Sequence, residues 1–429
     1  MNKIFKVVWN RTIGSFVVTS ELAKGRVKSS SEGAEGDVRA SEEGRLKTLF
    51  RLTALSAALL GFSEGAWAVI PEGSLTGGVL SIGTGSTSAN GAGAMAIGHN
   101  AQVKINGGLA IAPNSTHTTI SNGNNAIAIG VNLRADGSKA IGIGADTTVN
   151  GISAIAIGNN DSGRMANQGV SGNGAIGVGS NLTVRGNNAI AVGTESQAKA
   201  SDAVAVGTGA QATLANSIAI GKNSVATGMY GTAALGRATA IGFNTQALGE
   251  DSVAIGSGVD ANAAALAQNR QSVALGWSAK ATGTTQAVAI GPDAQASGAQ
   301  STSIGNNTRA TGDSSIAIGG DDWDDAKKSV NTQYKKLTGS DMSSGYQGTT
   351  AATAAVAVGV KAQATGALST AFGPGTIASG LGASAFGVGA SATQDKSVAI
   401  GAGSTTTINA EKITTATVNG ITYGGFAGT

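Results

Sequence analysis

The chain has 429 residues with a formal net charge of +3, and 67 of them are glycine, 12% are charged, 4% are aromatic and none is cysteine. The absence of cysteine excludes a disulfide scaffold and a thiolate metal site, and two histidines, His99 and His117, are too few for a histidine metal cluster. The composition therefore predicts a non-enzymatic protein with no cofactor, no metal site and no catalytic residue.

The positive charge is confined to the N-terminal part of the chain. Residues 1–68 contain 10 of the 28 basic residues and 7 of the 25 acidic ones, which leaves 18 of each sign in the rest. A nucleic-acid-binding surface needs basic side chains concentrated on one face. We therefore expect no nucleic-acid partner.

Residues 49–62, LFRLTALSAALLGF, form an apolar run directly after several basic residues. The run is shorter than the roughly 20 residues that span a bilayer, and Ala66-Trp67-Ala68 has the small-x-small pattern of a signal-peptidase site. The alternative is a buried core helix. We predict an export signal over residues 1–68 that is cleaved between Ala68 and Val69. N-terminal sequencing of exported protein should begin at Val69, and finding Met1 there would contradict the prediction.

The segment ahead of this apolar run is much longer than the charged start of an ordinary signal peptide. It contains MNK at residues 1–3, VWN at residues 8–10 and SELAKG at residues 20–25. These residues resemble the extended signal peptide region of large Gram-negative autotransporters and related exported adhesins. The resemblance implies that the extension slows inner-membrane translocation, so that the chain does not misfold in the periplasm.

Between residues 80 and 404 a short apolar string ending in glycine recurs many times. Within five groups of strings the closing glycines recur with a 14-residue period, and a second glycine often follows half a period after the first. The five groups are Gly130, Gly144 and Gly158; Gly179, Gly193, Gly207 and Gly221; Gly242 and Gly256; Gly291, Gly305 and Gly319; and Gly359, Gly373, Gly387 and Gly401. Between some groups the step is 20 or 21, which we interpret as an added half-unit.

Each unit is predicted to be a strand, a glycine turn, a second strand and a second glycine turn. Glycine permits the positive φ of tight turns, whereas a glycine at every seventh position would cost a helix about 1 kcal/mol each. One unit buries too little apolar surface to be stable alone, so the units must stack as a solenoid. Roughly twenty coils about 4.8 Å apart predict a rod nearly 100 Å long.

The second strand of a unit has one apolar and one polar face. Ala294 and Ala296 are small and apolar, and they alternate with Gln295 and Ser297. Because side chains alternate across a strand, this pattern predicts one face in the interior and one in solvent.

The first strand, as in Ser217-Ile218-Ala219-Ile220-Gly221, is apolar on both faces, which predicts that both faces are covered. If Ala219 packs inside a thin roll, Ile218 and Ile220 point outward along the whole rod. Such a stripe exceeds the apolar patch that a monomer tolerates, so we predict self-association along it. The alternative places Val and Ile inside, opposite Ala, and gives a monomeric rod.

The SVAIG units with AxAxG half-units, behind an extended signal, resemble the head of trimeric autotransporter adhesins of the YadA-like class. The resemblance implies an all-β fold, a left-handed parallel β-roll that trimerises about its long axis. It also implies a homotrimer at the bacterial cell surface that binds host extracellular matrix or host cells.

Collagen binding in some members of that class involves an NSVAIGxxS motif, and two stretches of this chain come closest to it. The candidate matrix-binding residues that the resemblance implies are Asn216, Ser217, Ile218, Ala219, Ile220, Gly221, Ser224, Ser397, Val398, Ala399, Ile400, Gly401 and Ser404. The same motif is also the structural repeat, so the alternative is that these residues only build a coil.

Residues 320–352 interrupt the repeat with a charged segment that resembles the insertion between head coils in related adhesins. Asp321, Asp322, Asp324 and Asp325 suggest calcium, yet their spacing lacks the alternate ligands, the glycine and the glutamate of an EF-hand. We predict a solvated, charge-balanced excursion.

The predicted domains follow from these boundaries. They are an extended signal peptide at 1–68, head repeats at 69–319, an insertion at 320–352, head repeats at 353–404 and a transition toward a neck or stalk at 405–429. The coiled-coil stalk and membrane β-barrel of the family do not occur before Thr429. We therefore expect attachment to the outer membrane through an anchor that is not present in this chain.

The leading functional prediction is a surface adhesin, and an autoagglutinin whose heads bind each other is the main alternative. A left-handed β-helix acyltransferase has six-residue periods and a catalytic histidine, which this chain does not match. An ice-binding solenoid needs regular ranks of threonine, whereas the outward positions here vary among Gln, Lys, Arg, Thr and Ser. Matrix binding and self-agglutination both remain open at this point.

Overall fold

The computed structural model describes residues 5–10, 15–20, 78–113, 116–160, 169–230, 233–234, 236–260, 262–406 and 415–425. The chain divides into two units, Met1–Gly65 and Ala66–Thr429. In the first unit, β1 (Phe5–Asn10) pairs antiparallel with β2 (Ser15–Ser20). The predicted cleavage between Ala68 and Val69 lies outside the described residues.

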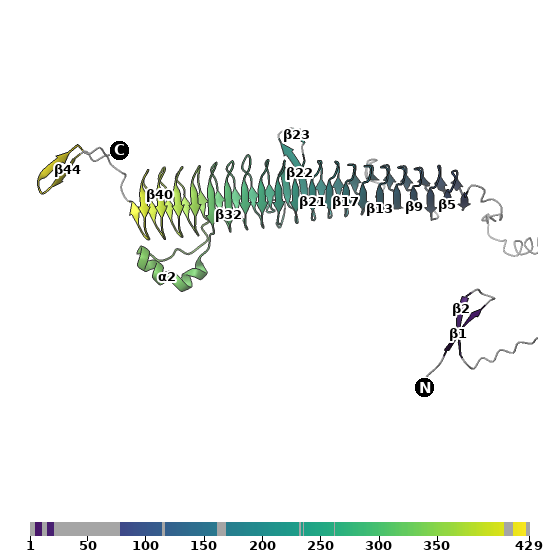
Figure 1. The fold of residues 1–429 in the computed structure, drawn as a ribbon, viewed down its shortest axis with the longest axis horizontal. Helices are drawn as coiled ribbons and strands as arrows, with labels where there is room; N and C mark the ends of the chain where they lie inside the picture. The colour runs from purple at the N-terminus through teal and green to yellow at the C-terminus, as the bar shows by residue number, and fades with distance from the viewer. Residues whose placement is uncertain are drawn as a thin grey trace, which may run out of the picture. The chain divides into compact units, whose positions relative to one another are not determined.

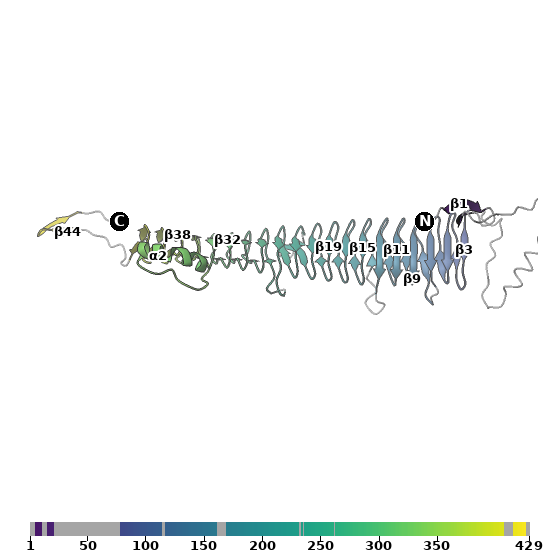
Figure 2. The same cartoon turned by 90° about the horizontal axis from the view of Figure 1, so that it is seen from below.

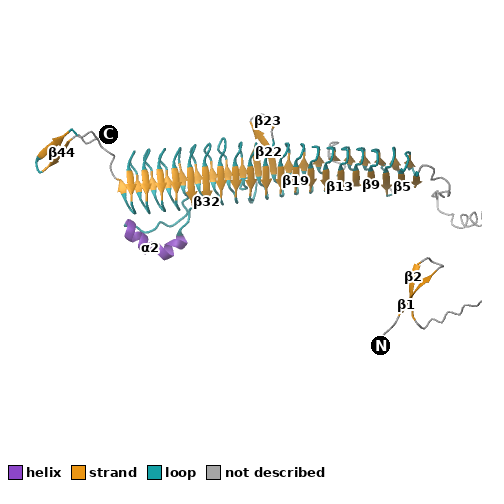
Figure 3. Ribbon diagram, viewed as in Figure 1, coloured by secondary structure: helices purple, strands orange, loops and turns teal. Residues whose placement is uncertain are grey.

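The second unit contains a parallel β-solenoid in which the strands stack one after another along a single axis (Figure 1). Two sheets form its sides, and Figure 3 shows the turns that join them. Sheet 1 contains, in the described residues, β3 (Leu80–Ile82), β5 (Met95–Gly98), β7 (Leu109–Ala112), β9 (Ile127–Val131), β11 (Ile141–Ala145), β13 (Ile155–Asn159), β15 (Ile176–Val178), β17 (Ile190–Val192), β19 (Val204–Val206), β21 (Ile218–Ile220), β24 (Thr239–Ile241), β26 (Val253–Ile255), β28 (Val273–Leu275), β30 (Val288–Ile290), β32 (Thr302–Gly305), β34 (Ile316–Gly319), β36 (Val356–Val358), β38 (Thr370–Phe372), β40 (Ser384–Phe386) and β42 (Val398–Ile400).

Sheet 2 is built from the shorter strands that alternate with these along the chain. They are β4 (Ser88–Ala89), β6 (Ala101–Val103), β8 (Thr119–Ser121), β10 (Arg134–Ala135), β12 (Thr148–Val149), β14 (Gly169–Val170), β16 (Thr183–Val184), β18 (Gln197–Ala198), β20 (Gln211–Ala212), β22 (Val225–Tyr230), β25 (Gln246–Gly249), β27 (Leu266–Ala267), β29 (Lys280–Ala281), β31 (Gln295–Ala296), β33 (Arg309–Ala310), β35 (Thr350–Ala351), β37 (Gln363–Ala364), β39 (Ile377–Ala378), β41 (Ser391–Ala392) and β43 (Thr405–Thr406).

Each strand pairs in parallel with the next strand of its own sheet, and the usual step along the sequence is that of the glycine repeat. Val204 of β19 pairs with Ile218 of β21, and Gln197 of β18 pairs with Gln211 of β20. The predicted all-β, parallel solenoid of 14-residue coils is therefore confirmed. Twenty strands about 4.8 Å apart make the ladder of sheet 1 roughly 90 Å long.

The prediction of added half-units is wrong. Ile155 pairs with Ile176 and Ile218 pairs with Thr239, so both 21-residue steps still make one coil. A real half-unit would bring a strand of sheet 2 into sheet 1 and break both ladders. In the second of these steps β22 runs beyond the ladder and pairs antiparallel with β23 (Ala233–Ala234), which protrudes from one edge in Figure 1.

The interior of a coil holds four small side chains, two from each sheet. In one coil these are Ala203, Ala205, Ala210 and Ala212, and none of them is exposed to solvent. The two sheets therefore lie too close together for Ile or Val at most inner positions. Alanine faces inward and its larger neighbours face outward, so the predicted outward position of Ile218 and Ile220 is confirmed and the alternative placement of Val and Ile inside is wrong.

Several coils hold larger inner residues, such as Val103 and Val184, and a glycine lies against each of them. Leu133 and Val149 are fully buried in sheet 2, and the opposite residue of sheet 1 is Gly142. A Cβ on Gly142 would lie 2.6 Å from a methyl of Leu133. The interior volume is thus held nearly constant along the rod, as expected for a close-packed core.

Glycines of both turns lie against the backbone of the next coil, and those after sheet 1 also adopt a positive φ. Gly207, after sheet 1, has a φ of 131°, the conformation that the sequence predicts for a glycine turn. Gly298, after sheet 2, is required by close approach alone: an added Cβ would lie 1.9 Å from the carbonyl oxygen of Gly312 in the next coil. In that turn the positive φ of 55° falls on Gln300.

We expect Gly298→Ala to destabilise the solenoid by roughly 2–3 kcal/mol, because backbone of the neighbouring coil must move to admit the methyl group. The matched control is Gly320→Ala, since no atom lies within 4 Å of a Cβ built there. Thermal unfolding followed by circular dichroism measures both. Equal melting temperatures for the two variants would contradict the close-approach argument.

Inside the range 320–352, the structure has a helix, α2 (Asp324–Thr338), where we expected only a solvated excursion. Asp324 and Asp325 lie in its first turn and Lys335 in its last, which complements the helix dipole, and Gly339 ends it with a φ of 79°. Figure 2 shows α2 alongside the last coils of the solenoid. No helix among the described residues is long and apolar enough to cross a membrane.

A short hairpin lies within the predicted transition region 405–429. It consists of β44 (Thr415–Val418) and β45 (Ile421–Gly424), which pair antiparallel. Asn419 and Gly420 form the turn, with φ angles of 51° and 80°. Asn-Gly with two positive φ angles is the favoured two-residue hairpin turn.

Candidate functional surface

The third residue of every strand of sheet 1 is apolar and faces outward, and none of these residues is buried. They stack in register from coil to coil. These residues, named here the apolar column, are Ile82, Ile97, Ile111, Ile129, Ile143, Ile157, Val178, Val192, Val206, Ile220, Ile241, Ile255, Leu275, Ile290, Ile304, Ile318, Val358, Phe372, Phe386 and Ile400.

Every member of the apolar column is at least partly accessible to solvent in the single chain, and nine of them are exposed. Ile220 is 37% exposed, Phe372 is 54% exposed and Ile400 is 70% exposed. With roughly 50 Å² from each side chain, the column presents about 1,000 Å², against roughly 300–600 Å² for the largest apolar patch of a typical monomer. A continuous apolar surface of this size is characteristic of a protein interface.

The outer face of sheet 2 is mainly polar, as the sequence predicts. Its outward positions hold Gln197, Gln211, Lys280, Gln295 and Arg309, while the alternating alanines point inward. The two faces of the rod therefore differ in chemistry: one suits contact with another apolar surface and the other suits water.

Two exposed aromatic side chains lie on the edge formed by the turns after sheet 1. Phe243 is 40% exposed and Trp277 is 45% exposed, and the Lys222 ammonium lies 5.9 Å from the centre of the Phe243 ring. The register of β24, β26 and β28 places the two aromatics two coils apart, about 9.6 Å along the rod. Sequence reasoning missed this pair, although both follow a closing glycine in a chain with 4% aromatic residues.

The first candidate matrix-binding stretch is a regular coil. Ser217, Ala219 and Ser224 are fully buried, and Ser224 Oγ donates to the carbonyl oxygen of Gly221 at 2.9 Å. Asn216 is exposed in the turn with a φ of 57°, and Ile220 belongs to the apolar column. The buried members can influence a partner only through the coil that they build.

The second candidate stretch has the same alternation. Ser397 and Ala399 are buried, while Val398 is 57% exposed and Ile400 is 70% exposed. Ser404 Oγ donates to the carbonyl oxygen of Ile400 at 2.6 Å. The structure places this stretch on the same outer face as the first, in the last coils of the solenoid.

A charged cluster lies at the base of the protruding hairpin. Glu250 is buried and pairs with Arg237 and, at 3.2 Å, with Arg270, while Asp251 accepts from Arg237 Nε at 2.6 Å. The hydrogen bond from Arg237 lowers the pKa of Asp251. The backbone N–H of Glu250 also donates to the carbonyl oxygen of Met229, so the cluster fixes the point at which β22 leaves the ladder.

The insertion is tied back to the solenoid at its base. Asp321, one of the residues considered for calcium, accepts hydrogen bonds from Asn306 at 2.6 Å and Asn307 at 3.1 Å. The buried Lys361 donates to the carbonyl oxygens of Ser343 and Gly345, and its ammonium lies 5.1 Å from the centre of the Trp323 ring. These contacts hold α2 over the turns of the following coils.

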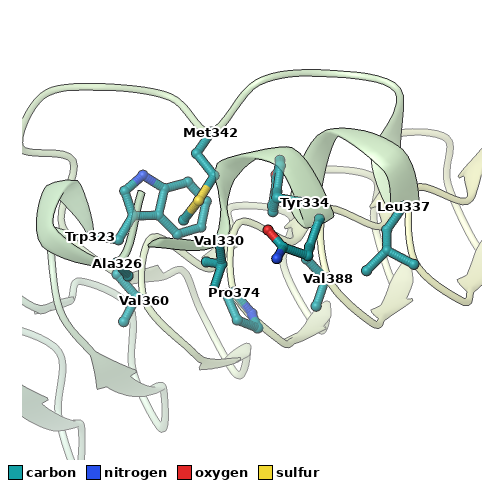
Figure 4. Close-up of a pocket in the computed structure, with 10 residues that line it drawn as sticks. Trp323, Ala326, Val330, Tyr334, Leu337, Met342, Val360, Pro374 and Val388 are labelled. Carbon is teal, nitrogen blue, oxygen red and sulfur yellow. The ribbon is translucent and has the colours of Figure 1, made fainter. Parts of the chain in front are cut away.

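An apolar cleft of about 310 Å³ separates α2 from those turns (Figure 4). Val330 and Leu337 of the helix face Val360, Pro374 and Val388 of three successive coils. Glycines make room for the helix on this edge. A Cβ on Gly375 would lie 2.7 Å from Trp323, and one on Gly389 would lie 2.8 Å from Thr338.

Comparison with known families finds two matches. Residues 1–49 match the family described as the extended signal peptide of the type V secretion system. The solenoid matches the YadA head domain repeat, and these matches together cover more than half of the chain. The matched ranges are 89–111, 135–160, 185–210, 212–234, 236–258, 267–294, 285–308, 296–321, 352–376 and 378–404.

Proposed function

Because the chain belongs to the trimeric autotransporter adhesins with a YadA-like head, we propose that three copies assemble along the apolar column and bind a collagen-like host matrix protein. The chain is an exported, surface-displayed autotransporter passenger, and its repeats are those of a structural adhesin rather than an enzyme. The uninterrupted apolar column is the observation that carries the proposal of assembly.

Assembly along the apolar column determines which surfaces stay available to a ligand. Ile218 and Ile220 would lie between chains, so these members of the candidate motif would act in assembly rather than in binding. Asn216, on the turn, and the polar face of sheet 2 would remain at the surface. Asn216 could therefore contact a ligand directly. The other motif residues would support binding only by keeping the coils and the proposed trimer intact.

The spacing of Phe243 and Trp277 supports an extended, proline-rich ligand. A polyproline II helix rises about 3.1 Å per residue with three residues per turn, so it repeats about every 9.3 Å. Two coils of the solenoid advance about 9.6 Å, close to that repeat. Successive turns of such a ligand can therefore stack on both rings, and Pro292 extends the same edge by one coil.

Three chains would also present every outer surface three times, which raises the effective concentration of each weak contact. Because residues beyond 68 carry equal numbers of basic and acidic side chains, no large electrostatic attraction contributes. We therefore expect binding to change little with salt, unlike capture by a basic patch.

The experiment measures binding of the exported head to immobilised collagen. Replacing Phe243 and Trp277 together by alanine should weaken binding roughly tenfold or more, because exposed aromatic anchors dominate interface energetics. The matched control is Gln295→Ala on the polar face. Unchanged affinity in the double variant would contradict the aromatic site.

The same experiment also tests the alternative that the protein is an autoagglutinin. A wild-type head that ignores collagen, fibronectin and laminin, yet clumps the cells that display it, would replace matrix binding by self-agglutination. Assembly along the apolar column would remain compatible with that result.

A further inference from the structure

A second hollow, distinct in chemistry from the apolar cleft, lies at the root of the insertion. It measures about 240 Å³ and shares the side chains of Trp323 and Tyr334 with the cleft. Its remaining lining includes Asp341, Lys361 and Gln363. A hollow of this size with a few convergent polar groups is suited to a small ligand.

The polar side chains of this hollow are held in place by their own hydrogen bonds. Asp341 accepts from Lys335 Nζ and from Asn331 Nδ2, each at 2.9 Å. Gln363 donates through Nε2 to the carbonyl oxygen of Gly348 at 2.7 Å. Their positions therefore do not depend on a ligand, which reduces the entropy lost on binding.

After these contacts Lys361 can still donate a hydrogen bond and Asp341 can still accept hydrogen bonds. The Lys361 ammonium has three donors, and the carbonyl oxygens of Ser343 and Gly345 take two. A carboxylate has about four lone-pair positions, of which the two contacts to Asp341 use two. A ligand of matching chemistry must both donate and accept at neighbouring atoms, as hydroxyl groups do.

The two charged groups of the hollow already have partners in the protein. Asp341 is paired with Lys335, and the hydrogen bond from this lysine lowers the pKa of the carboxyl group. Lys361 lies over the electron-rich face of Trp323. Lys361 thus keeps one donor for an oxygen atom of a ligand, and an uncharged hydroxyl group can supply that oxygen.

Apolar surface completes the lining. The rings of Trp323 and Tyr334 meet edge to face with their centres 5.5 Å apart, and Ile377, 41% exposed, lies on sheet 2 beside them. A sugar ring offers C–H groups to such a surface and hydroxyl groups to the polar side chains. We propose that this hollow binds one neutral hexose unit, as the terminal residue of a glycan.

The test is saturation-transfer difference NMR on the exported chain with four neutral probes: D-glucose, D-galactose, D-mannose and N-acetyl-D-glucosamine. At least one should bind, and Gln363→Ala should weaken it about fivefold or more, because one hydrogen-bonding side chain is lost. Gln295→Ala is the matched control, since it occupies the same register position on sheet 2 far from the hollow. Glycine and N-acetylneuraminic acid serve as charged probes.

A second variant, Ile377→Trp, fills the hollow from an exposed position, so it keeps the test valid if Gln363→Ala lowers the melting temperature. It should abolish the signal of the bound sugar. Binding of no neutral probe, preferential binding of a charged probe, or unchanged sugar binding in both variants would each overturn the proposal. None of these results would affect collagen binding or assembly, which use other surfaces.

Discussion

Replacing Ile220 by aspartate should dissociate the proposed trimer into folded monomers at micromolar concentration. Ile220 is 37% exposed in the single chain and lies near the middle of the apolar column. In an assembly along this column, three carboxylates would be buried close together, and each unpaired buried charge costs several kcal/mol. The coil itself should survive, because the side chain of residue 220 points away from its interior.

Light scattering coupled to size-exclusion chromatography measures the mass of this variant, and circular dichroism checks that its β structure is retained. Gln295→Asp is the matched control: it introduces the same charge on the polar face, where a surface carboxylate costs little. A trimeric Ile220→Asp variant as stable as the control would mean that the apolar column is not the interface.

Ala274→Leu should unfold the surrounding coils, whereas Leu275→Ala in the next position should leave the coils folded. Ala274 is fully buried between the two sheets, and Leu275 is 41% exposed on the apolar column. The interior is close-packed around four small side chains, so three added carbon atoms force the sheets apart, at a cost of about 3 kcal/mol or more. Enlarging the small residue is thus more harmful than truncating the large one.

Denaturant unfolding of the two variants, monitored in the far ultraviolet, tests this order of effects. Each should be measured in an Ile220→Asp background, so that loss of assembly does not contribute to the result. Leu275→Ala should then unfold within about 1 kcal/mol of its parent, since its site is solvent-exposed. A Leu275→Ala variant that is less stable than Ala274→Leu would contradict the thin-core account.

The regular part of the fold could be predicted because one physical constraint recurs in every coil. Glycine at every seventh position and the Ala–Ile alternation predict a two-sheet solenoid, and the structure has it. The pattern did not reveal why Gly298 is needed, since close approach to the next coil depends on how the coils stack. It also led to the half-unit interpretation, because spacing alone does not distinguish an added strand from a loop.

The irregular part of the fold could not be predicted in the same way, because it depends on contacts between segments that are far apart in the sequence. Gly375 and Gly389 have the pattern of ordinary turn glycines, yet in the structure they make room for α2. Lys361 has the pattern of a solvated turn residue, yet it is buried and holds the insertion loop. The acidic first turn and basic last turn of α2 were visible in the sequence and could have predicted that helix.

The aromatic pair shows a similar limit. Phe243 and Trp277 are far apart in the sequence, and one irregular step of the repeat, from Gly256 to Gly276, lies between them. Only the register of β24, β26 and β28 places them two coils apart on one edge. By contrast, the outward position of Ile220 followed from alternation within a single strand.

The central claim, that the apolar column joins copies of this chain, is tested most directly by the mass of the exported head in solution. Sedimentation equilibrium of residues 69–429 at micromolar concentration should give three times the mass of one chain, with no detectable monomer. A stable, soluble monomer under those conditions would contradict the account.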